Sequence, residues 1–163
     1  MKAHPKCKKL LLRASFCKEI KSMSFFTVPG KVRFGHTDSA GIIFYPRFFE
    51  IQNSVVEDWF DDALDHSFAE FREKFNLTTP LVDVNTQFLK PCRLGEKLDV
   101  QLGIIQLGRS SLILRVKAVR DEETCITSRA VLVCSKTDFT GSAPWPDAVR
   151  QRMLPYQIEE TAS

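Results

Sequence analysis

The second half of the chain alternates apolar and polar residues in four successive runs. They cover residues 81–90, 96–107, 110–119 and 125–136, with Val82, Val84, Thr86 and Phe88 on one face of the first run. A period of two is typical of a β-strand with one buried face. Because the breaks at 107–110 and 120–123 are short and polar, we expect neighbouring strands to be antiparallel and linked by hairpins. The pattern predicts an antiparallel meander with one apolar face.

Upstream, between residue 46 and about residue 64, the apolar period becomes that of a helix. The apolar positions are Phe48, Phe49, Val55, Val56, Trp59, Phe60, Ala63 and Leu64. Such a broad apolar face predicts a deeply buried helix, and Pro46 suits its first position because the missing N–H costs no hydrogen bond there. We expect a strand before this helix at about 31–35 and a short helix after it at about 67–75.

These elements together indicate one fold class. A sheet with one apolar face must be covered, and the helix at 46–64 is the one predicted element long enough to cover it. We therefore expect an α+β fold, in which a curved antiparallel five-stranded sheet wraps around one long central helix. Because one sheet on one helix leaves a small monomer short of buried surface, we also expect self-association.

Length and charge narrow the function classes. The chain has 163 residues and a formal net charge of +3 at pH 7, and this length fits one domain. Residues 1–22 hold seven Lys or Arg and one Glu, which leaves 16 basic and 19 acidic side chains in the remainder. A mildly acidic body lacks the clustered cations of a nucleic-acid-binding face, and its apolar runs are too short to span a bilayer. We expect neither nucleic acid nor membrane as a partner.

The basic segment 1–22 is expected to lie outside the folded domain. Its apolar stretch, Leu10 to Leu12, is shorter than a secretory signal requires. The segment is either an organellar transit peptide or an upstream extension, unstructured or from a mis-assigned start, with the working start at Met23. We expect a single domain over 23–140 and a C-terminal tail at 141–163. The five cysteines are scattered without a CxxC pair, which favours reduced thiols and a cytoplasmic location.

Polar side chains that could do chemistry gather where the first strand meets the long helix, in the sequence GHTDSAG at 35–41. His36 and Asp38 could ligate a metal, but a third ligand is needed and His66 is the one other histidine after residue 22. The run around Ser39 resembles a nucleophile elbow, yet that fold places its triad on a much larger parallel sheet. No cysteine has the local signature of a nucleophile paired with His36. We expect no metal site.

The remaining chemistry is a carboxylate beside a helix N-terminus. Asp38 precedes the helix by a few residues, and the first N–H groups of a helix point outward with the positive end of its dipole behind them. Such groups can hold the oxygen of a polarised carbonyl while the carboxylate attacks the carbonyl or activates water. This arrangement suits acyl transfer from an activated ester. The alternative is that Asp38 is an N-terminal turn or cap residue that accepts hydrogen bonds from the same amides.

The sequence VRFGHTDSAGIIFYPRFFE at 32–50 resembles the signature of the 4-hydroxybenzoyl-CoA thioesterase family, which has the hotdog fold. Members carry an Asp, then a residue pair ending in Gly, then Ile or Val, an aromatic pair and often Pro. The similarity extends more loosely through QFLKPCRLGEKLDV at 87–100 and the later strands, over about residues 25–140. The resemblance implies a long helix wrapped by an antiparallel sheet and assembled as dimers or tetramers.

The resemblance also implies roles for catalytic residues. Asp38 falls on the catalytic aspartate, which acts as nucleophile or general base toward the thioester carbonyl. Tyr45 falls on the residue whose backbone N–H polarises that carbonyl. His36 stands where several members have an acidic residue, and Ser39 where several have proline. His36 could tune the pKa of Asp38, assist proton transfer, or merely line the pocket.

The residues expected to bind substrate are Gly41, Asn85, Thr86, Lys90 and Arg93. The implied substrate is an acyl-CoA thioester, so coenzyme A is part of the substrate and no cofactor is expected. The two cations could bind the phosphates of CoA, and the polar residues of the strand at 81–90 are expected to face the acyl pocket across a dimer interface.

The sequence therefore predicts a homodimer or homotetramer that hydrolyses an aromatic or short- to medium-chain acyl-CoA to the free acid and CoA. Two alternatives stay open. The same fold could bind an acyl-CoA without hydrolysing it, or act as a dehydratase or hydratase that changes the acyl chain and keeps the thioester. The identity of the acyl group, the role of Asp38 and the number of subunits are not specified by the sequence.

Overall fold

The computed structural model describes residues 25–159. The basic segment 1–22 and its predicted role lie outside the described residues. Within the described part, the chain forms one five-stranded antiparallel sheet, a two-stranded sheet and the helices α1, α2 and α3. None of these helices is long and apolar enough to cross a membrane.

The main sheet has the strand order β1-β4-β5-β6-β3, with every neighbouring pair antiparallel. Its strands are β1 (Phe26–Lys31), β3 (Leu81–Phe88), β4 (Lys97–Leu107), β5 (Ser111–Arg120) and β6 (Glu123–Val133). Short turns join β4 to β5 and β5 to β6, as the polar breaks predict. The smaller sheet pairs β2 (Leu77–Thr78) with β7 (Ser135–Lys136).

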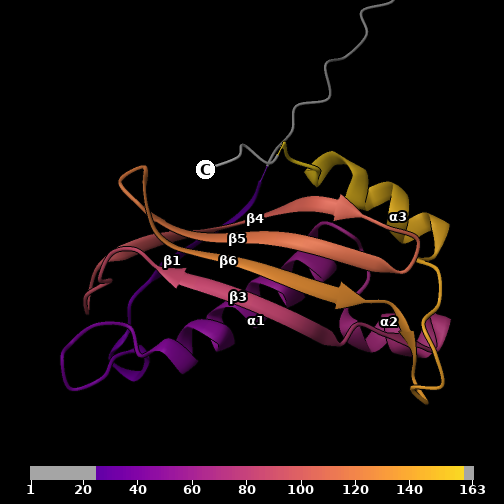
Figure 1. Cartoon of the computed structure of the whole chain (residues 1–163), viewed down its shortest axis with the longest axis horizontal. Coiled ribbons are helices and arrows are strands. Elements are labelled where there is room, and N and C mark those ends of the chain that lie inside the picture. Colours follow the sequence, from indigo (N-terminus) through magenta and orange to yellow (C-terminus); the bar gives the residue numbers. More distant parts are fainter. Residues whose placement is uncertain (1–24, 160–163) are drawn as a thin grey trace, which may run out of the picture.

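Helix α1 (Tyr45–Asp62) runs along one face of the main sheet (Figure 1). Its buried residues are Phe48, Gln52, Val55, Val56, Trp59 and Phe60. This spacing of three or four residues places them on one side of the helix, facing the sheet. The predicted fold class, an antiparallel five-stranded sheet around one long helix, is confirmed.

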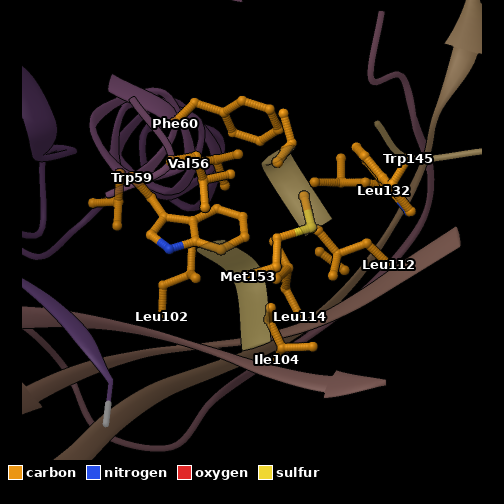
Figure 2. Packing of buried hydrophobic residues seen from close by; sticks show 14 of the residues in the cluster. Val56, Trp59, Phe60, Leu102, Ile104, Leu112, Leu114, Leu132, Trp145 and Met153 are labelled. Carbon is orange, nitrogen blue, oxygen red and sulfur yellow. The ribbon is translucent and has the colours of Figure 1, made fainter. Parts of the chain in front are cut away.

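The core lies between α1 and the sheet. Figure 2 shows Val56, Trp59 and Phe60 of α1 packed among side chains of the strands and of α3 (Asp147–Met153). Trp59 and Leu102 are both 0% exposed, and the alternate residues of β4 and β5 are buried as predicted. Removal of this apolar surface from water is the main stabilising contribution to such a fold.

The first strand lies earlier in the chain than predicted. β1 covers Phe26–Lys31 rather than about 31–35, and Phe34–His36 form a single 3-10 turn, η1. Pro29 lies within β1, opposite Asp99 of β4. A proline is tolerated there because β1 is an edge strand, whose outer side needs no N–H donor. The Pro-Gly pair therefore does not end a strand here, which is why the prediction was wrong.

β3 does not pair with β4, which follows it in sequence. It lies at the opposite edge, beside β6, so the predicted meander is correct for β4, β5 and β6 but wrong for β3. Segment 89–96 carries the chain across to β4. The apolar residues of β3 are exposed, with Val82 at 58%, Val84 at 37% and Phe88 at 47%. Within residues 25–159, no strand covers the outer edge of β3.

Helix α2 (Phe68–Phe75) agrees with the predicted short helix. The Ser67 hydroxyl accepts a hydrogen bond from the Glu70 N–H at 3.1 Å, and the Glu70 carboxylate accepts one from the Ser67 N–H at 3.0 Å. This reciprocal pair is a capping box. The helix ends at Asn76, which takes a left-handed conformation with φ of 53°, as C-terminal cap residues often do.

The segment 141–159, placed in a tail by the sequence analysis, contains α3. Trp145, Val149 and Met153 are buried in the same core as α1. The Arg150 guanidinium donates a 2.6 Å hydrogen bond to the carbonyl of Gly108 in the β4–β5 turn, and Figure 1 shows α3 beside that end of the sheet. The helix was missed because a helix of 7 residues shows too few apolar repeats to establish a period.

We expect Met153→Ala to destabilise the fold by about 2 to 5 kcal/mol, the usual cost of removing a large buried apolar side chain. Gln151→Ala, at an exposed position of the same helix, is the matched control and should change the free energy of unfolding little. Urea unfolding followed by circular dichroism measures both. Equal stability of the two variants would contradict the assignment of α3 to the core.

Candidate active site

The loop between β1 and α1 folds into a tight turn at Asp38. The Asp38 N–H donates to the Ile42 carbonyl at 3.1 Å, and the Gly41 N–H donates back to the Asp38 carbonyl at 3.0 Å. Gly41 has a φ of +72°, in the left-handed region that glycine enters without strain. The turn is therefore held by its own backbone and presents the Asp38 side chain outward.

Asp38 lines a cavity of about 350 Å³. Its Oδ1 atom accepts a 2.8 Å hydrogen bond from the Ala40 N–H, while Oδ2 has no donor among residues 25–159. Asp38 does not cap α1: the N-cap residue is Phe44, and no side chain accepts a hydrogen bond at that position. Asp38 is therefore a turn residue and not the cap of α1. Its second carboxylate oxygen has no donor in the described part of the chain.

The N-terminus of α1 reaches the same cavity. The Phe44 N–H donates to the His36 carbonyl at 2.9 Å, and the Arg47 N–H donates to the Phe44 carbonyl at 2.8 Å. Pro46 has no N–H. The Tyr45 N–H has no acceptor within the described residues, and Tyr45 lines the cavity. A helix N-terminus with a free N–H is a site for a partly negative oxygen.

The walls of this cavity come from three distant parts of the chain. Besides Asp38, Tyr45 and Lys90, the lining residues are Ile42, Ile43, Phe88, Leu89, Pro91, Cys92 and Ile126. Most are apolar, and they meet because segment 89–96 passes beside the Asp38 loop. Sequence reasoning missed these walls, since contacts between segments fifty residues apart leave no local signal.

His36 does not line the cavity that holds Asp38. It lines a separate one of about 150 Å³ whose other walls include Arg33 and Ile43. The His36 Nδ1 atom accepts a 3.2 Å hydrogen bond from the Arg33 N–H. Its backbone carbonyl accepts from Phe44, so the position of His36 supports the start of α1. No group of three or more His, Cys, Asp or Glu residues within 25–159 is arranged to hold a metal ion.

Lys90 and Arg93, the two cations predicted to bind phosphate, lie at different positions relative to the cavity. Lys90 lies at the cavity, and its Nζ atom forms an ion pair with the Glu123 carboxylate at 3.1 Å. The hydrogen bond and charge of Lys90 lower the pKa of Glu123 below its ordinary value. Arg93 is exposed and does not line the cavity; it forms an antiparallel bridge with Ile42.

Within one chain, Asn85 and Thr86 do not lie at this cavity. Both lie on β3, where Asn85 is exposed and the Thr86 hydroxyl lies 2.8 Å from that of Ser128. Neither lines the cavity, so their predicted contact with the acyl group depends on a second subunit.

Cys92 lines the cavity but has the properties of a structural thiol. Burial, followed by the neighbouring Cys125 thiol, raises the pKa of Cys92 to about 12. Because the thiolate is the reactive form, a thiol that stays protonated at neutral pH is a poor nucleophile. The carboxylate of Asp38 and the Tyr45 N–H are therefore the groups best suited to chemistry in this cavity.

Comparisons with known proteins show the family to which this chain belongs. The model of the thioesterase-like superfamily matches residues 32–153. A 1,4-dihydroxy-2-naphthoyl-CoA hydrolase from Synechocystis is 25% identical over 127 residues, which cover 76% of this chain and 91% of that protein.

Solved structures show the same fold. A 1,4-dihydroxy-2-naphthoyl-CoA thioesterase from Synechocystis superposes with a TM-score of 0.72 at 21% identity, covering 80% of this chain and 96% of that one. A gentisyl-coenzyme A thioesterase superposes with a TM-score of 0.68 at 22% identity, covering 79% of this chain and 99% of that one. The matched region contains the Asp38 loop, α1 and the main sheet from β3 to β6, and the chain belongs to the thioesterase-like superfamily.

Proposed function

We propose that this protein hydrolyses an acyl-CoA thioester to the free acid and CoA. The observation that carries the proposal is that Asp38 and Tyr45 line one largely apolar cavity. Among residues 25–159, Asp38 has one carboxylate oxygen without a donor and Tyr45 has an N–H without an acceptor. A thioester needs a group to polarise its carbonyl oxygen and a group to deliver the attacking oxygen. These two groups supply both functions, and the superfamily match supports the assignment.

In the proposed reaction, the thioester carbonyl oxygen accepts a hydrogen bond from the Tyr45 N–H, which stabilises the negative charge of the tetrahedral intermediate. As general base, Asp38 takes a proton from water while the water oxygen bonds to the carbonyl carbon. The C–S bond then breaks, and the CoA sulfur takes the proton from Asp38. As nucleophile, Asp38 would instead bond to the carbonyl carbon and expel the CoA thiolate, which takes a proton from solvent; water then hydrolyses the mixed anhydride to the free acid and Asp38. Both roles use the same two groups.

The acyl group is proposed to lie against the apolar walls formed by Ile42, Phe88 and Leu89. An aromatic or short- to medium-chain acyl group fits this lining, and the aromatic acyl-CoA substrates in the names of the relatives favour an aromatic one. Lys90 is proposed to bind a phosphate of CoA at the cavity rim, where Glu123 holds its ammonium in the free protein. Gly41, in the loop that holds Asp38, and Arg93, between β3 and β4, are also proposed to contact the substrate.

A homodimer is proposed to complete the site. β3 is an open edge strand with exposed apolar side chains, and such edges favour pairing with another strand. Pairing there would bury those side chains and bring Asn85 and Thr86 to the acyl pocket of the partner subunit. A tetramer of two such dimers is compatible with the same edge. The free cysteines among the described residues, Cys92, Cys125 and Cys134, favour a reducing, cytoplasmic location.

Asp38→Asn should keep the fold and lower kcat by roughly 10² to 10⁴, the usual effect of removing one acid or base group. Release of free thiol from an acyl-CoA measures turnover. Ser39→Ala, one residue along the same exposed turn, is the matched control and should retain activity. Loss of activity in Ser39→Ala with none in Asp38→Asn would instead point to a serine nucleophile.

Mass spectrometry of the products should show a free acid and CoA for at least one member of a panel of acyl-CoAs. The panel runs from acetyl to palmitoyl and includes benzoyl, hydroxybenzoyl, gentisyl and 1,4-dihydroxy-2-naphthoyl thioesters. We expect the highest kcat/KM with an aromatic acyl group, because the cavity walls are apolar and the name of a relative specifies an aromatic acyl-CoA. Tight binding without CoA release would favour a binding module, and an altered acyl chain on an intact thioester would favour a dehydratase or hydratase.

Val84→Lys should convert the oligomer to monomers, because it places a charge among the exposed apolar residues of the β3 edge. Light scattering after size exclusion measures the mass. Gln106→Lys adds the same charge at an exposed position of β4. Because β4 lies beside β1, near the edge of the sheet opposite β3, this variant should leave the assembly unchanged. An unaltered oligomer in Val84→Lys would exclude β3 as the interface.

A further inference from the structure

Segment 89–96, between β3 and β4, forms one wall of the cavity but has no helix or strand of its own. Leu89, Lys90, Pro91 and Cys92 line the cavity directly. The backbone N–H groups of Leu89 and Lys90 both donate to the Cys125 carbonyl, at 2.8 and 3.0 Å. The start of the segment is thus fixed to β6, while the position of the remainder depends on other contacts.

One side of the segment is joined to the Asp38 loop by backbone hydrogen bonds. The Ile43 N–H donates to the Cys92 carbonyl at 2.9 Å, and the Leu94 N–H donates to the Gly41 carbonyl at 3.0 Å. The Gly95 N–H donates to the Val32 carbonyl at 2.9 Å. These bonds lie on both sides of the turn that presents Asp38. A movement of the segment would therefore move the carboxylate relative to the N-terminus of α1.

The other side of the segment is held by the side chain of Arg120, at the end of β5. Its Nη1 atom donates to the Pro91 carbonyl at 3.2 Å and to the Glu96 carboxylate at 2.8 Å. Its Nη2 atom donates to the Glu123 carboxylate at 3.2 Å. Glu96 also accepts the Arg93 N–H at 2.8 Å, so Arg120 fixes the middle and the end of the segment together.

These contacts require arginine. The planar guanidinium donates in several fixed directions at once, whereas a lysine ammonium is a single point charge on a flexible stem. The Arg120 side chain is 25% exposed and that of Glu96 26%, so this ion pair is better shielded from water than that of Lys90 with Glu123, at 52% and 46%. Hydrogen bonds between ionised groups are stronger than neutral ones.

We propose that Arg120 is a positioning residue for the hydrolysis, holding segment 89–96 and, through it, the Asp38 loop in reactive geometry. Arg120 does not line the cavity and need not touch the substrate. The inference rests on the proposed function, since it assigns Arg120 to the same reaction.

The test compares Arg120→Met and Arg120→Lys with the wild-type protein and with Arg152→Met. Arg152 is the matched control, because it forms an ion pair with Asp65 at 2.9 Å, outside both segment 89–96 and β3. Amide hydrogen exchange is measured at Ile43, Leu94 and Gly95, and kcat and KM are measured with an acyl-CoA and with the corresponding acyl-pantetheine, which has no phosphate.

We expect Arg120→Met to lower kcat by roughly 10- to 100-fold with both substrates, because small displacements of a catalytic group are costly. Exchange at the three amides should quicken at least about ten-fold while the β5 and β6 amides stay protected. Arg120→Lys should recover part of both effects, and Arg152→Met should show neither.

If the wild type is active and Arg120→Met changes neither amide exchange nor kcat, the inference about Arg120 is overturned and the proposed function stands. A loss of activity that appears only as a higher KM for acyl-CoA, and not for acyl-pantetheine, would also overturn the inference. Arg120 would then act on phosphate binding through Glu123 and Lys90. Faster exchange at every amide would indicate general destabilisation and would also overturn it. A wild-type protein that releases no CoA from any thioester would instead overturn the proposed function, and the exchange data would still report whether Arg120 holds the segment.

Discussion

Burial of one side of α1 against the sheet determines the rest of this structure. Phe48, Val55, Trp59 and Phe60 are almost completely removed from water, and each large buried side chain contributes about 1.5 to 3 kcal/mol by this transfer. With these residues fixed, the helix can neither rotate nor slide without exposing apolar surface. Its first turn, and hence the Tyr45 N–H, is therefore fixed relative to the sheet.

The proposed chemistry depends on bringing a carboxylate to that fixed helix end. The chain does so with a turn closed by its own backbone and by Gly41. Backbone hydrogen bonds join the turn to segment 89–96, and Val32 and Ile43 on its two sides are buried with Cys92 in one apolar cluster. The site therefore combines a rigid donor on a buried helix with a carboxylate on an exposed turn whose two ends are fixed. A division of this kind lets the scaffold carry stability while the loop residues carry function.

Much of this arrangement could be predicted from the sequence. The alternation in β4, β5 and β6 and the helical period of α1 follow directly from burial on one face, so the fold class and most buried residues of these elements were predicted correctly. Pro46 and the adjoining aromatic pair located the start of α1. The block around Asp38 indicated a carboxylate near that start, because the spacing between them is local in sequence.

Other features could not be predicted, for physical reasons. β1 was misplaced because an edge strand tolerates Pro29, and α3 was missed because it is short. The pairing of β3 with β6 depends on how segment 89–96 crosses the molecule, which leaves no periodic signal. For the same reason, nothing local in the sequence relates Arg120 to Pro91 or separates His36 from the cavity of Asp38.

The central claim is that Asp38 and the Tyr45 N–H act on one carbonyl group. The most direct measurement is a crystal structure with an acyl-CoA analogue in which a methylene group replaces the thioester sulfur. The account predicts that the ketone oxygen accepts the Tyr45 N–H at about 2.9 Å, with an Asp38 carboxylate oxygen, or a water bound to it, facing the carbonyl carbon. A ketone bound away from both groups, for example in the cavity beside His36, would contradict it.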